Sequence, residues 1–226
     1  MIRLNRYIAN SGVCSRRDAD KLISSGKIMV NKQVVNSLGV KVGDNDVVEY
    51  NGDVLSPQKL IYLLVNKPKN TSALDFINDK SNENLSVLGE MQECFSGLIV
   101  LTNDQYLIDR LSNSSARIKQ KFILKTEKKI EQKQINKLIQ GINLDGIKVC
   151  FDDINYGRQE KDNFQLIVTV SFGSVAYIGQ AFKKLNNKLI NADRIEFGGV
   201  IKGDLIRGKS RVLLHKEIGF LKMIKV

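Results

Sequence analysis

The chain has 226 residues, of which 42% are hydrophobic and 26% charged, a composition typical of folded globular proteins and not of disordered chains. Thirty-five Lys and Arg outnumber 24 Asp and Glu, which leaves a formal net charge of +11 at pH 7 and makes nucleic acid the leading partner class. A chain of this length can form one small and one medium domain, and we predict two.

Several classes of protein are not expected from the sequence. The three cysteines, Cys14, Cys94 and Cys150, are widely spaced, which predicts neither a disulfide framework nor a zinc site. Neither a nucleotide-binding loop nor a metal spacing around His215 occurs, so we expect no cofactor and no metal. No segment approaches the ~20 apolar residues of a membrane span. We expect a cytoplasmic monomer that does not contact membranes.

Residues 1–56 predict a small unit of two helices and a sheet. Apolar residues at helical spacing precede a stop signal at Ser11-Gly12, and a second helix is expected from Ser15, whose hydroxyl can cap it together with Asp18. After Gly26 the apolar residues alternate, as in strands. The turn signals between these strands are Asn31-Lys32, Gly43-Asp44 and Asn51-Gly52.

Basic residues gather in this segment. Residues 1–41 hold eight basic residues against two acidic ones, a net charge of +6, and guanidinium groups at helix starts can bind phosphates. The run RLNRYIANSGVCSRRDADKLISSGKIMVNKQVV resembles the S-four RNA-binding domain, named for a small-subunit ribosomal protein. The resemblance implies RNA-binding roles for Arg3, Arg6, Ser15, Arg16, Arg17 and Lys21.

A polar breaker at 56–59 precedes a second segment, residues 61–226. Its compact apolar runs and alternating patterns predict strands at 61–65, 97–101, 121–126, 165–172 and from 192, and helices after Asn103-Asp104, at 130–139 and at 176–185. Strands and helices mixed in this way predict an α+β fold with a largely antiparallel sheet.

The order of motifs in the second segment carries a further resemblance. IYLLVNKPK at 61–69, GLIVLTND at 97–104, a basic strand and GVIKGDLIRGKSRVL at 199–213 together resemble the RsuA/RluB family of ribosomal-RNA pseudouridine synthases over nearly the whole chain. Members of that family isomerise a uridine in RNA: they cleave its glycosidic bond, turn the base and rejoin it through carbon five, without cofactor or metal. The resemblance implies this fold, with ribosomal RNA or a pre-ribosomal particle as partner.

The family's essential aspartate ends a G-R-L-D motif. Counting back without a gap from Leu-Thr-Asn-Asp, the corresponding residues are Gly89, Glu90, Met91 and Gln92. An amide is neutral and poorly nucleophilic, so Gln92 cannot ionise to attack or to abstract a proton. The resemblance therefore predicts an RNA-binding relative without catalytic activity.

Other family positions differ in the same direction. Gln120, Lys121 and Phe122 replace a K-x-Y element, which leaves Phe122 as the ring that can stack on a base. Residues 173–180, GSVAYIGQ, replace a run resembling G-R-N-R-Q-V-R-R and remove its guanidinium groups. Lys67 is expected to contact RNA, although the segment after it passes quickly to LDFI at 74–77, where the family usually inserts an RNA-gripping loop.

Two alternatives remain open. Glu90, Glu93 or Asp104 can act as a displaced catalytic acid, in which case the chain is an active pseudouridine synthase. Alternatively, the apolar residues at 175–178 form an exposed patch, and the larger segment is a protein-interaction scaffold.

Overall fold

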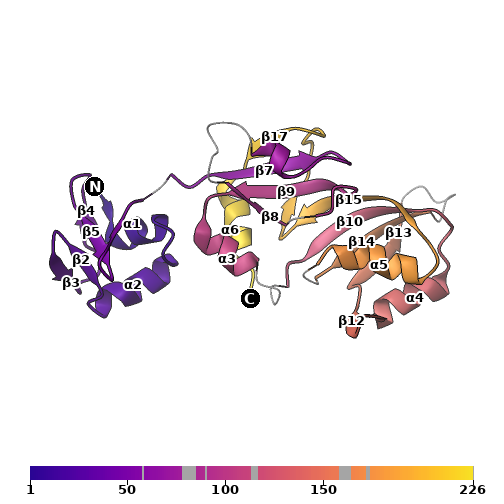
Figure 1. The fold of residues 1–226 in the computed structure, drawn as a ribbon, viewed down its shortest axis with the longest axis horizontal. Coiled ribbons are helices and arrows are strands. Elements are labelled where there is room, and N and C mark those ends of the chain that lie inside the picture. Colours follow the sequence, from indigo (N-terminus) through magenta and orange to yellow (C-terminus); the bar gives the residue numbers. More distant parts are fainter. Residues whose placement is uncertain are drawn as a thin grey trace. The chain divides into compact units, whose positions relative to one another are not determined.

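The computed structural model describes residues 1–57, 59–77, 85–89, 91–112, 117–157, 164–171 and 174–225 (Figure 1). Of the positions singled out in the sequence, Gln58, Glu90, Phe172 and Gly173 lie outside these ranges. The chain divides into two compact units. Unit 1 is Met1–Ile61 with Asp104–Tyr106, and unit 2 is Tyr62–Asn103 with Leu107–Val226.

Unit 1 has the predicted helices and small sheet. Helix α1 spans Leu4–Asn10 and helix α2 spans Arg16–Ser24. As predicted, Ser15 caps α2: its hydroxyl accepts the amide of Asp18 at 3.1 Å and donates to the Asp18 carboxylate at 2.7 Å. The strands are β1 (Ile2–Arg3), β2 (Ile28–Val30), β3 (Gln33–Val35), β4 (Lys41–Val42), β5 (Val48–Tyr50) and β6 (Asp53–Leu55).

Two tight turns organise the sheet of unit 1. Among the described residues, β3, β2, β5 and β6 form an antiparallel sheet in that order, and β1 pairs with β4. Asn31-Lys32 and Asn51-Gly52 have positive φ angles, which two-residue hairpin turns require. The helices pack on the sheet through a common core that includes Leu4, Ile8, Ile23, Ile28 and Val48.

Unit 2 is built on a mixed sheet. Its described strands run in the order β13-β14-β10-β15-β9-β7-β17, with β16 beside β15 and β8 beside β9. These pairs are antiparallel except β15 with β9, which confirms the predicted α+β class with a mostly antiparallel sheet. The strands are β7 (Tyr62–Lys67), β8 (Ser86–Leu88), β9 (Ser96–Thr102), β10 (Gln120–Thr126), β13 (Asp153–Tyr156), β14 (Gln165–Val170), β15 (Leu189–Phe197), β16 (Val200–Ile201) and β17 (Ser210–Val212).

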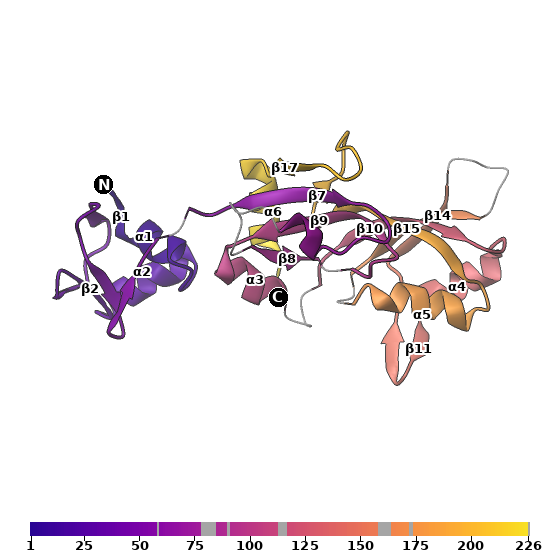
Figure 2. The same cartoon turned by 45° about the horizontal axis from the view of Figure 1, so that its top comes forward.

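Helices lie at two places along this sheet. Helices α4 (Gln132–Gln140) and α5 (Ala176–Lys184) lie near β14, whereas α3 (Gln105–Leu111) and α6 (His215–Met223) lie near β8 and β9 (Figures 1 and 2). The hairpin of β11 (Ile142–Leu144) and β12 (Ile147–Val149) projects from the α4–α5 end (Figure 2). A 3-10 turn, η1, covers Leu74–Phe76.

The helix boundaries differ from the sequence prediction in two places. Helix α4 begins at Gln132 instead of residue 130, because Glu131 caps it in a reciprocal arrangement with Gln134. Helix α6 was not predicted; the Glu217 carboxylate accepts the amide of Leu214 at 2.8 Å and so caps the start of this helix. No helix among the described residues is both long and apolar enough to cross a membrane.

Candidate functional site

Gln92 lies on the turn that leads into β9. Its side chain is exposed, while the neighbouring Met91 is buried and anchors the turn in the core. The carbonyl of Gln92 accepts the amide of Phe95 at 3.0 Å, and the Cys94 thiol lies 3.8 Å from its amide oxygen. The position that the family resemblance assigns to the catalytic acid therefore carries a neutral amide at the mouth of a buried strand.

Arg194 on β15 lies behind this turn and is fully buried. Its Nε donates to the carbonyl of Leu98 at 2.6 Å, its Nη1 to the Gln120 amide oxygen at 2.9 Å, and its Nη2 to the carbonyl of Gly89. The rings of Phe197 and Phe122 lie 4.8 and 5.9 Å from the guanidinium carbon. Burial lowers the pKa of Arg194 to about 9. Among the described residues, no carboxylate contacts this guanidinium.

Two glycines allow the strands to close around Arg194. Gly97 has φ +111°, and a side-chain carbon there would overlap the backbone of Arg194, so only glycine lets β9 approach β15 at this point. Gly89 has φ +73°, and a side-chain carbon there would overlap the ring of Phe197. The segment before position 92 is thus held close to Arg194 by sterics and by the Gly89 carbonyl.

The structure corrects the role predicted for Lys67. Its side chain is fully buried, and the three N–H groups of its ammonium are shared among four backbone carbonyls, those of Pro68, Thr71, Glu93 and Phe95, at 2.8–3.1 Å. Desolvation lowers the pKa of Lys67. An ammonium enclosed in this way has no face for an RNA phosphate. Lys67 instead joins the loop after β7 to the turn that carries Gln92.

Phe122 is also buried, with no exposed surface, between Arg194 and the core of the sheet. A base cannot stack on a ring that the protein encloses, so the prediction that Phe122 stacks on the target base is corrected. The same strand places Gln120 against Arg194. Both replacements in the K-x-Y element therefore serve the interior of unit 2.

The alternative acids differ in their exposure. Glu93 is exposed beside Gln92, whereas Asp104 is 2% exposed and directly precedes α3. Burial at Asp104 leaves no room for a substrate against its carboxylate. Glu90 lies outside the described residues. Of the three acids, Glu93 is the one that the structure presents to solvent at the turn.

A further buried acid, Asp193, lies one residue before Arg194. Its carboxylate accepts Arg207 at 2.7 Å, Lys202 at 3.0 Å and the Ser96 hydroxyl at 3.0 Å. Burial by itself raises the pKa of Asp193, but the bonds from Arg207 and Lys202 outweigh it and the pKa lies below its usual range. Arg207 also donates to the Asn66 side chain at 2.6 Å. This cluster ties the segment after β16 to the sheet.

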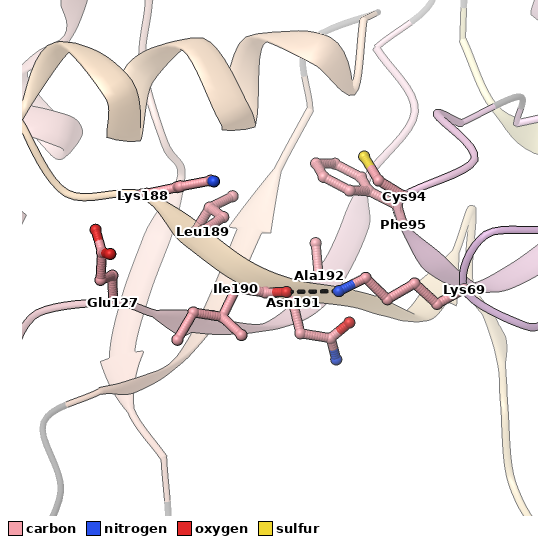
Figure 3. Close-up of a pocket in the computed structure, with 9 residues that line it drawn as sticks. All are labelled: Lys69, Cys94, Phe95, Glu127, Lys188, Leu189, Ile190, Asn191 and Ala192. Carbon is pink, nitrogen blue, oxygen red and sulfur yellow. Dashed lines mark hydrogen bonds between the residues drawn. The ribbon is translucent and has the colours of Figure 1, made fainter.

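A pocket of about 470 Å³ opens beside the turn, between that turn and the first half of β15 (Figure 3). Pairing of β15 with β9 covers only Asp193 and Arg194, so the edge of β15 before them is free of β9. Lys69 crosses to this edge and donates to the carbonyl of Ile190 at 2.8 Å. The lining residues are Lys69, Cys94, Phe95, Glu127, Lys188, Leu189, Ile190, Asn191 and Ala192.

In unit 1 the predicted RNA-binding cations lie on the surface. Arg3, Arg6, Arg16, Arg17 and Lys21 are all exposed. Within the described ranges only Lys21 of these five forms an ion pair, with Asp18 at 2.8 Å. Ser15 is half-buried and engaged in capping α2, so its hydroxyl has a structural role on this surface.

The residues at 175–178 do not form an exposed apolar patch. Val175 is 5% exposed and Ile178 is fully buried, because this face of α5 packs into the interior of unit 2, to which the helix belongs. The surface on which the scaffold hypothesis was based is therefore absent. Ser174, where the family resemblance places an arginine, is exposed.

Comparison with known proteins identifies the relatives of this chain. The S4 domain family matches residues 2–48. An uncharacterized RNA pseudouridine synthase of Aquifex aeolicus (strain VF5) is 30% identical over 232 residues, which cover 97% of this chain and 93% of the relative. The chain belongs to the RNA pseudouridine synthase family.

Other members of this pseudouridine synthase family align over similar lengths. Ribosomal large subunit pseudouridine synthase B of Bacillus subtilis (strain 168) is 27% identical over 99% of this chain and 97% of its own. Ribosomal small subunit pseudouridine synthase A of Vibrio parahaemolyticus is 23% identical over 96% of this chain and 98% of its own length. The crystal structure of a pseudouridylate synthase superposes with a TM-score of 0.65 at 22% identity, covering 98% of this chain and all of that one, which shows the same fold.

The residues around Arg194 were missed in the sequence. Its bonds join residues 74, 96 and 105 positions apart, so no local spacing indicates them. The available signal was an arginine within the strand expected from residue 192, since a charged residue that a sheet buries requires enclosed partners. Among the described residues, no group of His, Cys, Asp and Glu has the arrangement of a metal site.

Proposed function

We propose that this chain binds ribosomal RNA and does not isomerise uridine, as a catalytically silent member of the pseudouridine synthase family. The observation that carries the proposal is Gln92, a neutral amide at the position of the family's aspartate. Ribosomal RNA is favoured because the relatives from Bacillus subtilis and Vibrio parahaemolyticus are named for the large and small ribosomal subunits.

Physical chemistry supports the loss of catalysis. A nucleophile or base for this reaction must ionise and must lie within ~3 Å of the atom that it attacks. The amide of Gln92 does not ionise, and Asp104 is buried directly before α3. Arg194 meanwhile donates to the Gln120 side chain and to two backbone carbonyls, and within the described ranges it has these partners in place of a carboxylate.

The exposed cations of unit 1 support RNA binding. Guanidinium groups donate in a planar fork that matches phosphate oxygens. Arg16 and Arg17 lie at the N-terminus of α2, where the helix dipole adds to their attraction for anions. Each phosphate that a cation neutralises releases counterions, so binding should weaken as salt rises.

Binding is tested with fragments of ribosomal RNA at a series of salt concentrations. The double variant Arg16→Ala/Arg17→Ala should reduce the slope of log affinity against log salt by about 1.4–1.8, for two lost contacts. Lys133→Gln/Lys148→Gln, which removes the same charge from α4 and β12, is the control and should change the slope little. Wild-type binding without salt dependence would contradict the proposal.

The absence of catalytic activity in the cell is tested by mapping pseudouridines in ribosomal RNA from strains with and without the gene. The proposal predicts identical maps. A site that disappears with the gene would establish activity, and its survival in a Gln92→Ala strain would locate the acid elsewhere.

One observation favours an active enzyme as the second candidate. Glu93 is exposed next to Gln92, and its carbonyl is fixed by Lys67 and by the amide of Asn70 at 2.7 Å. If Glu93 is a displaced acid, Glu93→Gln should abolish a pseudouridine that the wild type forms. Unchanged formation in that variant would remove this candidate.

A further inference from the structure

The pocket beside Gln92 is bordered by more positive than negative charge. Lys69 and Lys188 are both exposed along it, and Glu127 is its one acid among the described lining residues. Figure 3 shows Glu127 at the end of the pocket away from Cys94, with the Lys188 ammonium between them. Of the lining residues nearest the turn, Lys69 is positive and Cys94 and Phe95 are neutral, while the exposed Glu93 lies on the same turn directly before Cys94.

Two buried cations add to the positive electrostatic potential of the pocket. The Lys67 ammonium binds the carbonyls of Glu93 and Phe95, directly beneath the turn that forms one wall. Arg194 follows the lining residue Ala192 by two positions on β15. Arg194 contacts no carboxylate within the described part of the chain, and the charge of Lys67 is partly offset by the nearby Glu93, so the two cations together still raise the potential inside the pocket.

The chemistry of the walls fits a phosphate attached to an apolar body. The Lys69 ammonium uses one of its three donors on the Ile190 carbonyl and keeps two for a ligand. Leu189, Ile190 and Ala192 offer aliphatic surface beside it. A volume of about 470 Å³ holds a sugar together with its phosphate.

We propose that this pocket binds a backbone phosphodiester of RNA between Lys69 and Lys188, so that it acts as a phosphate clamp in unit 2. The assignment rests on the proposed RNA-binding function and goes beyond it by naming the group that is bound and the residues that bind it. The amide oxygen of Gln92 lies 3.8 Å from the thiol of the lining residue Cys94, so a carboxylate at position 92 would be close enough to the pocket to repel a phosphate bound there.

The clamp is tested with a synthetic RNA hairpin that has a single-stranded, uridine-containing loop. Lys69→Gln/Lys188→Gln should reduce the slope of log affinity against log salt by about 1.4, since each single-strand phosphate contact contributes roughly 0.7. Lys133→Gln/Lys148→Gln again matches the change in charge and should leave the slope near that of the wild type. A loop with neutral methylphosphonate linkages should bind wild type and Lys69→Gln/Lys188→Gln equally.

Charge changes at two further positions should shift the affinity for the hairpin in opposite directions. Gln92→Glu adds a negative charge beside the lining residue Cys94 with little change in shape and should weaken binding of the hairpin. Glu127→Gln removes the pocket acid and should strengthen it. The inference is overturned if Gln92→Glu leaves affinity unchanged or raises it, or if the two lysine pairs have equal effects.

A free nucleotide carries the same phosphate chemistry and is tested separately. Uridine monophosphate should compete with the hairpin only weakly, because it offers one phosphate without the loop. If it binds the pocket as tightly as the hairpin does, the site belongs to a free nucleotide and the assignment to RNA is wrong. Failure of the clamp is distinct from failure of RNA binding: in the first case wild type still binds the hairpin through Arg16 and Arg17, and in the second it does not bind.

Discussion

The two units carry positive charge in opposite ways. The arginines of the first two helices in unit 1 are exposed, and none of them forms an ion pair among the described residues. In unit 2, Arg194 and Lys67 are fully buried, and their donors are used on backbone carbonyls and on Gln120. Exposed cations gain most from a polyanionic ligand, whereas enclosed cations hold the chain together.

One sequence rule gives different answers in the two units, because side-chain burial differs between them. A basic residue within a resemblance to an RNA-binding enzyme suggests RNA contact, and this holds only where the side chain reaches solvent. Lys67 has the residue type without the exposure. Burial, which the sequence pattern predicts poorly for single polar residues in strands, decides between the two roles.

The largest effect is expected from removing the buried guanidinium. Arg194→Ala leaves a cavity and removes the donors of Gly89, Leu98 and Gln120, which should lower the free energy of unfolding by about 3–5 kcal/mol. Arg117→Ala, at an exposed position of the same unit, should change it by less than about 0.5 kcal/mol. Urea denaturation of both variants measures the difference, and equal effects would show that Arg194 is not a structural centre.

Loss of the buried ammonium should have the next largest effect. Lys67→Met keeps most of the length of the side chain but removes the ammonium that four carbonyls share, of which those of Pro68 and Glu93 keep a second donor, at a cost of about 2–4 kcal/mol. Lys69→Met, two residues along and exposed, is the matched control. The denaturant midpoints of the two variants measure the difference. A Lys67→Met protein as stable as Lys69→Met would contradict the buried, structural role of Lys67.

A second cation beside Arg194 should also destabilise. Gln120→Lys recreates the lysine implied by the family pattern but places an ammonium about where the amide now accepts from the guanidinium at 2.9 Å. Like charges in a buried site repel, so we expect a loss on the order of 2–3 kcal/mol. Gln120→Met, without charge, should lose less. If thermal unfolding shows that Gln120→Lys is the more stable of the two, the site has room for a cation.

The smallest effect is expected at Asp193 and depends on pH. Because its pKa is lower in the folded chain than the ordinary 3.8, its carboxylate stabilises the fold above about pH 4, and this contribution is lost as pH falls through the folded value. Asp193→Asn should cost about 1–2 kcal/mol at neutral pH, since Lys202 and Arg207 are partly exposed.

The gap between wild type and Asp193→Asn should therefore narrow as pH is lowered below about 4. Unfolding curves at neutral and acidic pH measure it. A gap that stays constant or widens with acid would mean that Arg207 and Lys202 do not hold the carboxylate in its ionised form.

Local patterns predicted much of the fold. The cap at Ser15, the turns at Asn31-Lys32 and Asn51-Gly52 and the apolar run of β9 depend on neighbouring residues, and each appears in the structure as predicted. The resemblance to pseudouridine synthases, which the comparisons confirm, supplied the order of the remaining elements.

Local sequence patterns could not predict which side chains are buried inside the candidate site. Whether Lys67 and Phe122 face solvent depends on the approach of β9 to β15 at Gly97, which is a contact between distant segments. The free edge of β15 and the pocket along it arise from the same long-range pairing. The sequence therefore indicated where the chemistry had changed but not what encloses that position.

The most direct measurement is a single-turnover assay with protein in excess over ribosomal RNA that carries tritium at carbon five of its uridines. Formation of pseudouridine transfers the glycosidic bond to that carbon and releases its hydrogen to water. With Gln92 at the catalytic position, we predict that the protein binds the RNA and releases no tritium above the level of a protein-free control. Tritium released in proportion to bound protein, and lost in Glu93→Gln, would contradict the account.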